Sequence, residues 1–151
     1  MTEHTFHTHG HAAAQEGSSF QAMPKSLGTY IQPAPGATME LSGWFHFSIP
    51  APSVLNGISL QVERVWVHFA AGLKAKIDRL ELWESDSRIW DLRDLNWTGR
   101  SAHWEIPYLS TPQHFSRGLG LSLNVVIEGA ADGNLVERCV FLHSVAVTVR
   151  S

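Results

Sequence analysis

Nine histidines and six tryptophans are the residues of this 151-residue chain whose types and spacing could do chemistry. The densest group is "HTFHTHGH", in which His7, His9 and His11 alternate and would project to one side of an extended chain. Imidazole nitrogens suit Zn²⁺, Ni²⁺ and Cu²⁺, and a His-rich segment wraps such ions readily. We therefore expect weak metal binding by His7, His9 and His11, and no other cofactor.

A second histidine lies in "SGWFHFSIP", an aromatic run that Pro50 ends. Side chains alternate between the two faces of a strand, so Phe45 and Phe47 share one face while Trp44 and His46 share the other. If the phenylalanines face the core, His46 is either a neutral ring satisfied by its neighbours or, with Trp44, part of a shallow binding face.

Trp97 and Trp104 flank Arg100 in a tryptophan-rich stretch. An aromatic ring beside planar hydrogen-bonding groups is the arrangement that sugar-binding sandwiches use, because rings stack on pyranose faces. The alternative interpretation is that these tryptophans fill a core or an oligomer interface.

Motifs that define common enzyme classes are missing from the sequence. It contains no G-x-S-x-G nucleophile elbow, no phosphate-binding G-x-x-x-x-G-K-[ST] and no dinucleotide-binding glycine motif at the start of a helix. Carboxylates such as Glu81 and Asp91 are interpreted as residues of turns and solvated strand faces. These observations favour a protein that is not an enzyme.

Composition narrows the choice of partner. The formal net charge is −3, from 11 basic and 14 acidic residues, without a basic run, which argues against nucleic acid or an anionic membrane. Cys139 is the single cysteine, so an intrachain disulfide is excluded. Neither a secretory signal nor an apolar run of about 20 residues is visible, so we expect a cytoplasmic protein.

The elements that must position these residues are strands. From residue 27 onward the apolar residues recur with period two, interrupted by glycine and proline. Residues 58–69 change phase near Glu63–Arg64, which indicates either a β-bulge there or a strand buried on both faces. Residues 118–129 and 137–150 read as a C-terminal hairpin joined by "EGAADGN". We predict an all-β fold, an antiparallel β-sandwich of about seven to eight strands over residues 27–151, preceded by a flexible His-rich tail at 1–26.

"GWFHFSIPAPSVLNGISLQVERVWVHF", together with "DLNWTG" and "GLGLSLNVVIEG", resembles an uncharacterised family of small bacterial domains with a W-F-H-F-x-I-P motif. The resemblance covers residues 28–149 and implies a sandwich-like fold, without an activity, cofactor or catalytic residue to transfer.

Three hypotheses follow for the function. The first is a non-enzymatic binding or self-assembling module, with a homo-oligomer or another protein as its partner, because residues 58–69 and 139–149 are apolar on both strand faces. The second is a lectin-like module that binds a carbohydrate or small molecule through Trp44, His46, Trp97, Arg100 and Trp104. The third is a small His-dependent metalloprotein or enzyme built around His46 and His68.

Overall fold

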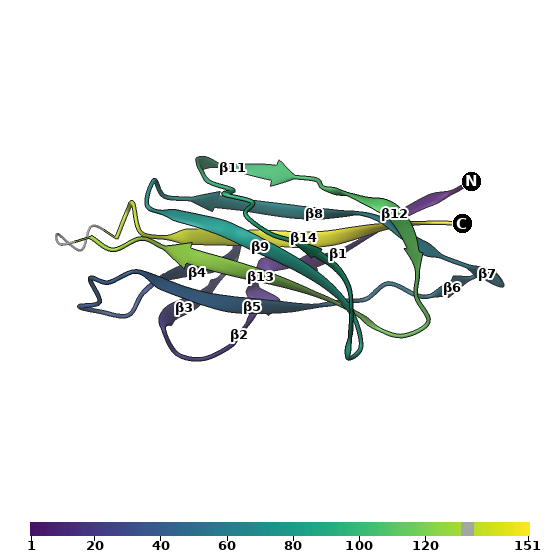
Figure 1. Cartoon of the computed structure of the whole chain (residues 1–151), viewed down its shortest axis with the longest axis horizontal. Coiled ribbons are helices and arrows are strands. Elements are labelled where there is room, and N and C mark those ends of the chain that lie inside the picture. Colours follow the sequence, from purple (N-terminus) through teal and green to yellow (C-terminus); the bar gives the residue numbers. More distant parts are fainter. Residues whose placement is uncertain (131–134) are drawn as a thin grey trace.

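A computed structural model describes residues 1–130 and 135–151 and shows an all-β protein (Figure 1). Two antiparallel sheets lie face to face, which confirms the predicted β-sandwich. In the described part of the chain the strands number fourteen, more than the seven or eight expected, because several are short or belong to the N-terminal segment. The elements are β1 (Glu3–His9), the 3-10 turn η1 (Gly10–Ala12), β2 (Ala14–Gln15), β3 (Phe20–Lys25), β4 (Gly28–Pro33), β5 (Leu41–Ile49), β6 (Val54–Leu55), β7 (Ile58–Ser59), β8 (Gln61–Ala71), β9 (Ala75–Glu84), β10 (Ser87–Leu92), β11 (Gly99–Glu105), β12 (Tyr108–His114), β13 (Leu119–Ile127) and β14 (Val140–Arg150).

The larger sheet has seven strands in the order β11-β8-β14-β4-β3, with β12 also paired to β8 and β1 also paired to β14. The smaller sheet has five strands in the order β10-β9-β13-β5-β2. A separate two-stranded ribbon, β6 with β7, lies between β5 and β8 along the chain. No helix in the described residues has the length and hydropathy to cross a membrane.

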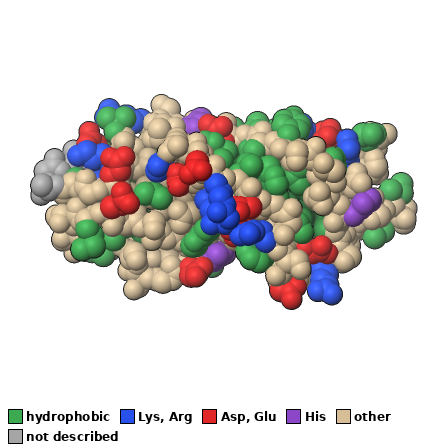
Figure 2. Space-filling view, in the orientation of Figure 1, with side chains coloured by type: hydrophobic (Ala, Val, Ile, Leu, Met, Phe, Trp, Pro, Cys, Tyr) green, Lys and Arg blue, Asp and Glu red, His purple; other side chains and the backbone are tan. Residues whose placement is uncertain are grey.

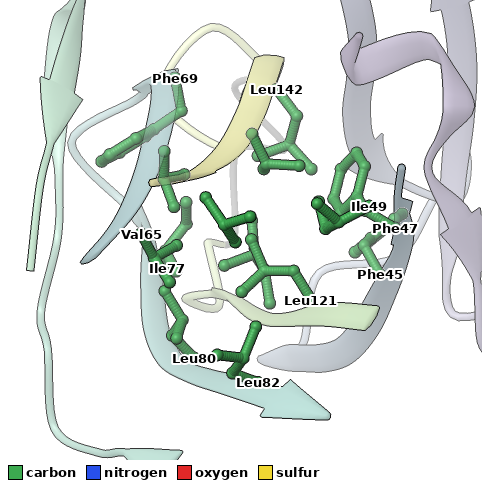
Figure 3. Packing of buried hydrophobic residues seen from close by; sticks show 14 of the residues in the cluster. Phe45, Phe47, Ile49, Val65, Phe69, Ile77, Leu80, Leu82, Leu121 and Leu142 are labelled. Atoms are coloured by element: carbon green, nitrogen blue, oxygen red, sulfur yellow. The ribbon is translucent and has the colours of Figure 1, made fainter. Parts of the chain in front are cut away.

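The core lies between the sheets and follows the period-two pattern of the sequence. Phe45, Phe47 and Ile49 of β5 point inward with Leu121 of β13, towards side chains such as Leu142 of β14 in the opposite sheet (Figure 3). Burying one such side chain contributes about 1.5–3 kcal/mol. Because Phe45 and Phe47 face inward, the outward position of Trp44 and His46 is fixed.

The predicted bulge in β8 is confirmed. Arg64 pairs with Thr148 while Val62 pairs with Val149, so Glu63 is an extra residue in β8. The buried face accordingly passes from Val62 to Val65, which keeps both halves of the strand apolar towards the core.

The N-terminal segment corrects one expectation. Residues 1–26 were expected to be a flexible tail outside the sandwich, but Glu3–His9 pairs residue by residue with Arg150–Ser144 of β14. Phe20 of β3 is buried and Phe6 of β1 packs partly buried against the core. The segment looked tail-like because its few apolar residues are isolated; backbone pairing along β14 holds it instead.

The expected C-terminal hairpin is also wrong. β13 pairs with β5 and β9 in the smaller sheet, whereas β14 pairs with β8, β4 and β1 in the larger one. The chain therefore changes sheets after β13, and residues 131–134 of the expected turn lie outside the described residues.

A buried arginine, Arg138, links the connection between β4 and β5 to the segment that follows β13. Arg138 has no exposed surface and donates hydrogen bonds to the carbonyls of Glu128 (2.9 Å), Ala37 (2.6 Å) and Met39 (2.9 Å). These bonds tie the β4–β5 connection to the segment that follows β13.

Candidate functional site: a groove on the outer face of the five-stranded sheet

The outward face of β9, β13 and β5 carries an open groove of about 520 Å³. Figure 2 shows arginine or lysine and acidic side chains gathered over the middle of this face. The groove is lined by Glu16, Trp44, His46, Phe47, Arg79, Glu81, Trp83, Ser85, Arg88, Gly120, Leu121 and Ser122.

His46 stands at one wall of the groove and is hydrogen-bonded on both sides. It pairs in register with Ser122 of β13, whose Oγ lies 2.7 Å from Nδ1. Nε2 lies 2.8 Å from a carboxylate oxygen of Glu16, just after β2. The edge strand β2 runs beside β5 with Ala14 opposite His46, so the N-terminal segment brings Glu16 to the ring.

Glu81 organises the opposite wall from β9. Its side chain is only 8% exposed, and one carboxylate oxygen accepts a hydrogen bond from Arg88 Nη1 (3.0 Å) and forms an ion pair with Arg79 Nη2 (2.7 Å). The other oxygen accepts from the indole N–H of Trp83 (2.9 Å). A nearly buried carboxylate needs such partners, and here they fix the positions of two guanidinium groups and one ring.

Asp91 of β10 extends this network. Arg79 donates to both of its oxygens (2.8 and 3.0 Å) and Arg93 donates a further bond of 2.8 Å. These contacts, the Arg79 hydrogen bond first, lower the pKa of Asp91 to about 2. Asp91 therefore stays charged at any physiological pH and keeps Arg79 in place.

Two indole rings border the groove in different ways. The guanidinium of Arg79 lies over the Trp44 ring, 5.5 Å from its centroid, and covers one of its faces. Trp83 pairs across β9 and β13 with Gly120, which has no side chain to shield the ring. Both rings are partly exposed, and among the described residues a guanidinium is recorded over the ring of Trp44 but not over that of Trp83.

The row Ser122–His46–Glu16 has the residue types of a hydrolytic triad, but the backbone N–H groups around Ser122 are not free to serve as the oxyanion donors that acyl transfer needs. β13 is paired on both sides, with β5 and with β9, so the backbone N–H groups around Ser122 are used in the sheet. The arrangement suits hydrogen bonding to a ligand better than nucleophilic attack.

The structure divides the ligand-binding residues predicted from the sequence. Trp44 and His46 line the groove, whereas the other three lie elsewhere. Trp97 pairs with Ile77 through an isolated bridge and packs against the core. Arg100 of β11 is exposed and lies 3.7 Å from Glu137.

Trp104 lies on the outer face of the other sheet. Its ring stacks on His68, with centroids 4.4 Å apart, and His68 in turn stacks on His143 at 4.7 Å. Burial, first of all, lowers the pKa of both histidines, and His143 adds to the effect on His68. His68 is thus a packing partner in this row of rings.

His7 and His9 are outward-facing residues of β1, and His11 lies in η1. The His9 and His11 rings have centroids 4.3 Å apart. Within residues 1–130 and 135–151, no group of three or more His, Cys, Asp or Glu side chains is arranged to hold a metal ion. Weak metal binding by His7, His9 and His11 stays a prediction.

Sequence reasoning missed Glu81, Trp83, Arg88 and Ser122 as site residues. Glu81 and Asp91 were assigned to solvated faces, yet Glu81 is buried and both are paired. The alternation in "LELW" does place Glu81 and Trp83 on the face opposite Leu80 and Leu82. The alternation therefore predicts which face Glu81 and Trp83 take, but it does not predict which strands lie beside β9.

These features define a class of protein: an antiparallel β-sandwich with an open groove of tryptophan and paired polar side chains on the outer face of one sheet. The chain belongs to a family of unknown function (DUF6623), whose model matches residues 1–149. This match agrees with the resemblance to an uncharacterised family and extends over the N-terminal segment. No curated protein matches the chain.

Solved structures similar to the chain share the sandwich. TmCBM61, in complex with β-1,4-galactotriose, is 10% identical with a TM-score of 0.50, over 89% of this chain and 85% of the other. Exo-β-1,3-galactanase from Phanerochaete chrysosporium, with galactose, is 12% identical with a TM-score of 0.50, over 95% of this chain and 29% of the other. A carbohydrate-binding module, CBM36 with calcium and xylotriose, is 10% identical with a TM-score of 0.49, over 93% of this chain and 98% of the other. At these identities the similarity shows the fold alone.

Proposed function

We propose that this chain is a carbohydrate-binding module that holds sugars in the groove on the outer face of the five-stranded sheet. The observation that carries the proposal is the ring of Trp83, which is partly exposed beside Gly120 and donates its N–H to a carboxylate that also fixes Arg79 and Arg88. An aromatic face takes the apolar side of a sugar ring, and fixed polar groups beside it take the hydroxyls.

Hydrogen-bonding capacity remains for a ligand. Among the described residues, Arg88 uses only Nη1, towards Glu81 and Asp91, so its other N–H groups have no protein partner. Glu16 offers a second carboxylate oxygen beside the one that contacts His46. TmCBM61, which matches over 85% of its length at a TM-score of 0.50, was solved in complex with β-1,4-galactotriose, and this supports a sugar as the ligand.

The test compares two tryptophans on opposite faces. The protein and its Trp83→Ala and Trp104→Ala variants are screened against a panel of glycans and titrated with each binder by calorimetry. We expect Trp83→Ala to weaken binding by about tenfold or more, because tenfold is only about 1.4 kcal/mol of lost stacking. Trp104→Ala should leave the affinity within about twofold, because its ring lies on the other sheet.

Circular dichroism of both variants controls for folding. Wild-type protein that binds no glycan in the panel contradicts the proposal. Equal losses in the two variants would contradict the placement of the site.

A further inference from the structure

Two glycines at the groove are not required by the fold. A Cβ at Gly120 would lie 3.7 Å from the Phe47 carbonyl oxygen and 3.9 Å from Trp83 Cβ, which are ordinary contacts, and a Cβ at Gly118 would meet nothing within 4 Å. Neither glycine has a left-handed φ. By contrast, a Cβ at Gly28 would collide with the Leu142 carbonyl.

Glycine inside a strand is unfavourable, because it loses more backbone freedom than other residues and packs no side chain. Since β13 could hold a side chain at Gly120 without strain, the fold does not explain the residue. Its effect is to leave open the space above β13 beside Trp83 and His46.

That space continues across the sheet. A second hollow of about 480 Å³ adjoins the first and shares His46, Phe47, Ser85 and Gly120 with it. It reaches Ala12 and Ala14 beside β5, whereas the first reaches Arg79 and Arg88 on the other side. The distance from β9 across β13 and β5 to β2 is three strand spacings, or about 14 Å, and this is longer than one sugar ring.

The charges at the groove are balanced by one another. Arg79 and Arg88 contact Glu81, and Arg93 contacts Asp91. Within the described residues each of these guanidinium groups is already paired with a carboxylate, so an anionic sugar would gain little net charge attraction and would face Glu16, Glu81 and Asp91. The hydroxyls of an uncharged sugar can use the remaining N–H groups of Arg88.

We infer that the ligand is an uncharged chain of several linked sugars, laid across β9, β13 and β5 over Gly118 and Gly120. This inference rests on the proposed carbohydrate-binding function. Trp83 stacks on one sugar, and the glycines and the alanines near β2 leave room for the sugars that follow.

The experiment uses neutral oligosaccharides from one to six units of the glycan that binds best, and uronic-acid chains of matching length. We expect the affinity to rise by about tenfold or more from one sugar to three, and the uronic-acid chains to bind at least about tenfold more weakly. Equal affinity for one and several sugars, or tighter binding of the uronic acids, overturns the inference.

Gly120→Val tests the floor of the groove, since valine suits a strand and fills the space without removing a contact. We expect about a tenfold or greater loss of affinity with an unchanged unfolding temperature. Gly120→Ala, which adds a single methyl group, is the second variant, and Ser42→Val is the control on the outer face of β5 outside the groove. Undiminished binding by folded Gly120→Val and Gly120→Ala overturns the inference but leaves the proposed function standing. Wild-type protein that binds no glycan refutes the proposed function itself.

Discussion

Replacing Glu81 by glutamine tests whether the groove is held by one nearly buried carboxylate. The substitution keeps the size of the side chain but removes its charge and turns one acceptor into a donor. Glu81 accepts hydrogen bonds from Arg88 (3.0 Å) and Trp83 (2.9 Å) and forms an ion pair with Arg79 (2.7 Å). Hydrogen bonds to charged groups contribute about 1.5–3 kcal/mol each.

Two of the three partners keep some compensation, which limits the loss. Arg79 remains paired with Asp91, and the Arg88 side chain is 41% exposed and can turn to water. We therefore expect Glu81→Gln to lower the free energy of unfolding by about 3 kcal/mol, near the value of one to two such bonds. For a chain of this size that corresponds to an unfolding temperature lower by about 6–12 °C.

The measurement is urea unfolding at pH 7, followed by tryptophan fluorescence. Asp86→Asn is the matched control, because Asp86, in the turn between β9 and β10, forms a long, exposed ion pair of 3.9 Å with Arg117. Such pairs contribute little, so the control should lose less than about 0.5 kcal/mol. A loss for Glu81→Gln as small as that of the control would refute the reasoning.

Three further outcomes are expected. Arg138→Met should lower the free energy of unfolding in urea by about 3 kcal/mol, because a buried guanidinium that donates to three carbonyls is lost. Arg138→Lys should recover part of this loss. Equal losses in the two variants would contradict the reasoning. Burial lowers the pKa of His68 and His143, so the folded state binds fewer protons than the unfolded state. Their contribution to stability is complete above about pH 6.5 and is lost as the pH falls through the lowered values. Between pH 7.5 and 5 the free energy of unfolding should therefore decrease less in His68→Phe than in the wild type. Parallel curves for the two proteins would count against this. Deleting residues 1–9 removes β1 and exposes the edge of β14 that it covers. The unfolding temperature should therefore fall, and size-exclusion chromatography should show aggregation. If neither changes, β1 does not contribute to the sheet.

The period-two pattern determined the fold class and the facing of individual side chains. Because successive side chains of a strand point to opposite faces, the sequence alone predicted that Phe45 and Phe47 share one face and Trp44 and His46 the other. The structure shows that the face of the phenylalanines is the buried one. The phase change in residues 58–69 likewise located the bulge at Glu63. These are properties of one strand at a time.

Strand pairing was decided by the tertiary structure, and with it the composition of the groove. His46 and Ser122 are 76 residues apart, and they meet only because β13 lies beside β5 instead of forming a hairpin with β14. Trp104 was predicted as a site residue because it lies close to Trp97 and Arg100 in the sequence. It belongs instead to β11 of the seven-stranded sheet, away from the groove. Local alternation tells which face a residue takes, but long-range pairing decides which residues share that face, because many pairings would bury the same apolar side chains equally well.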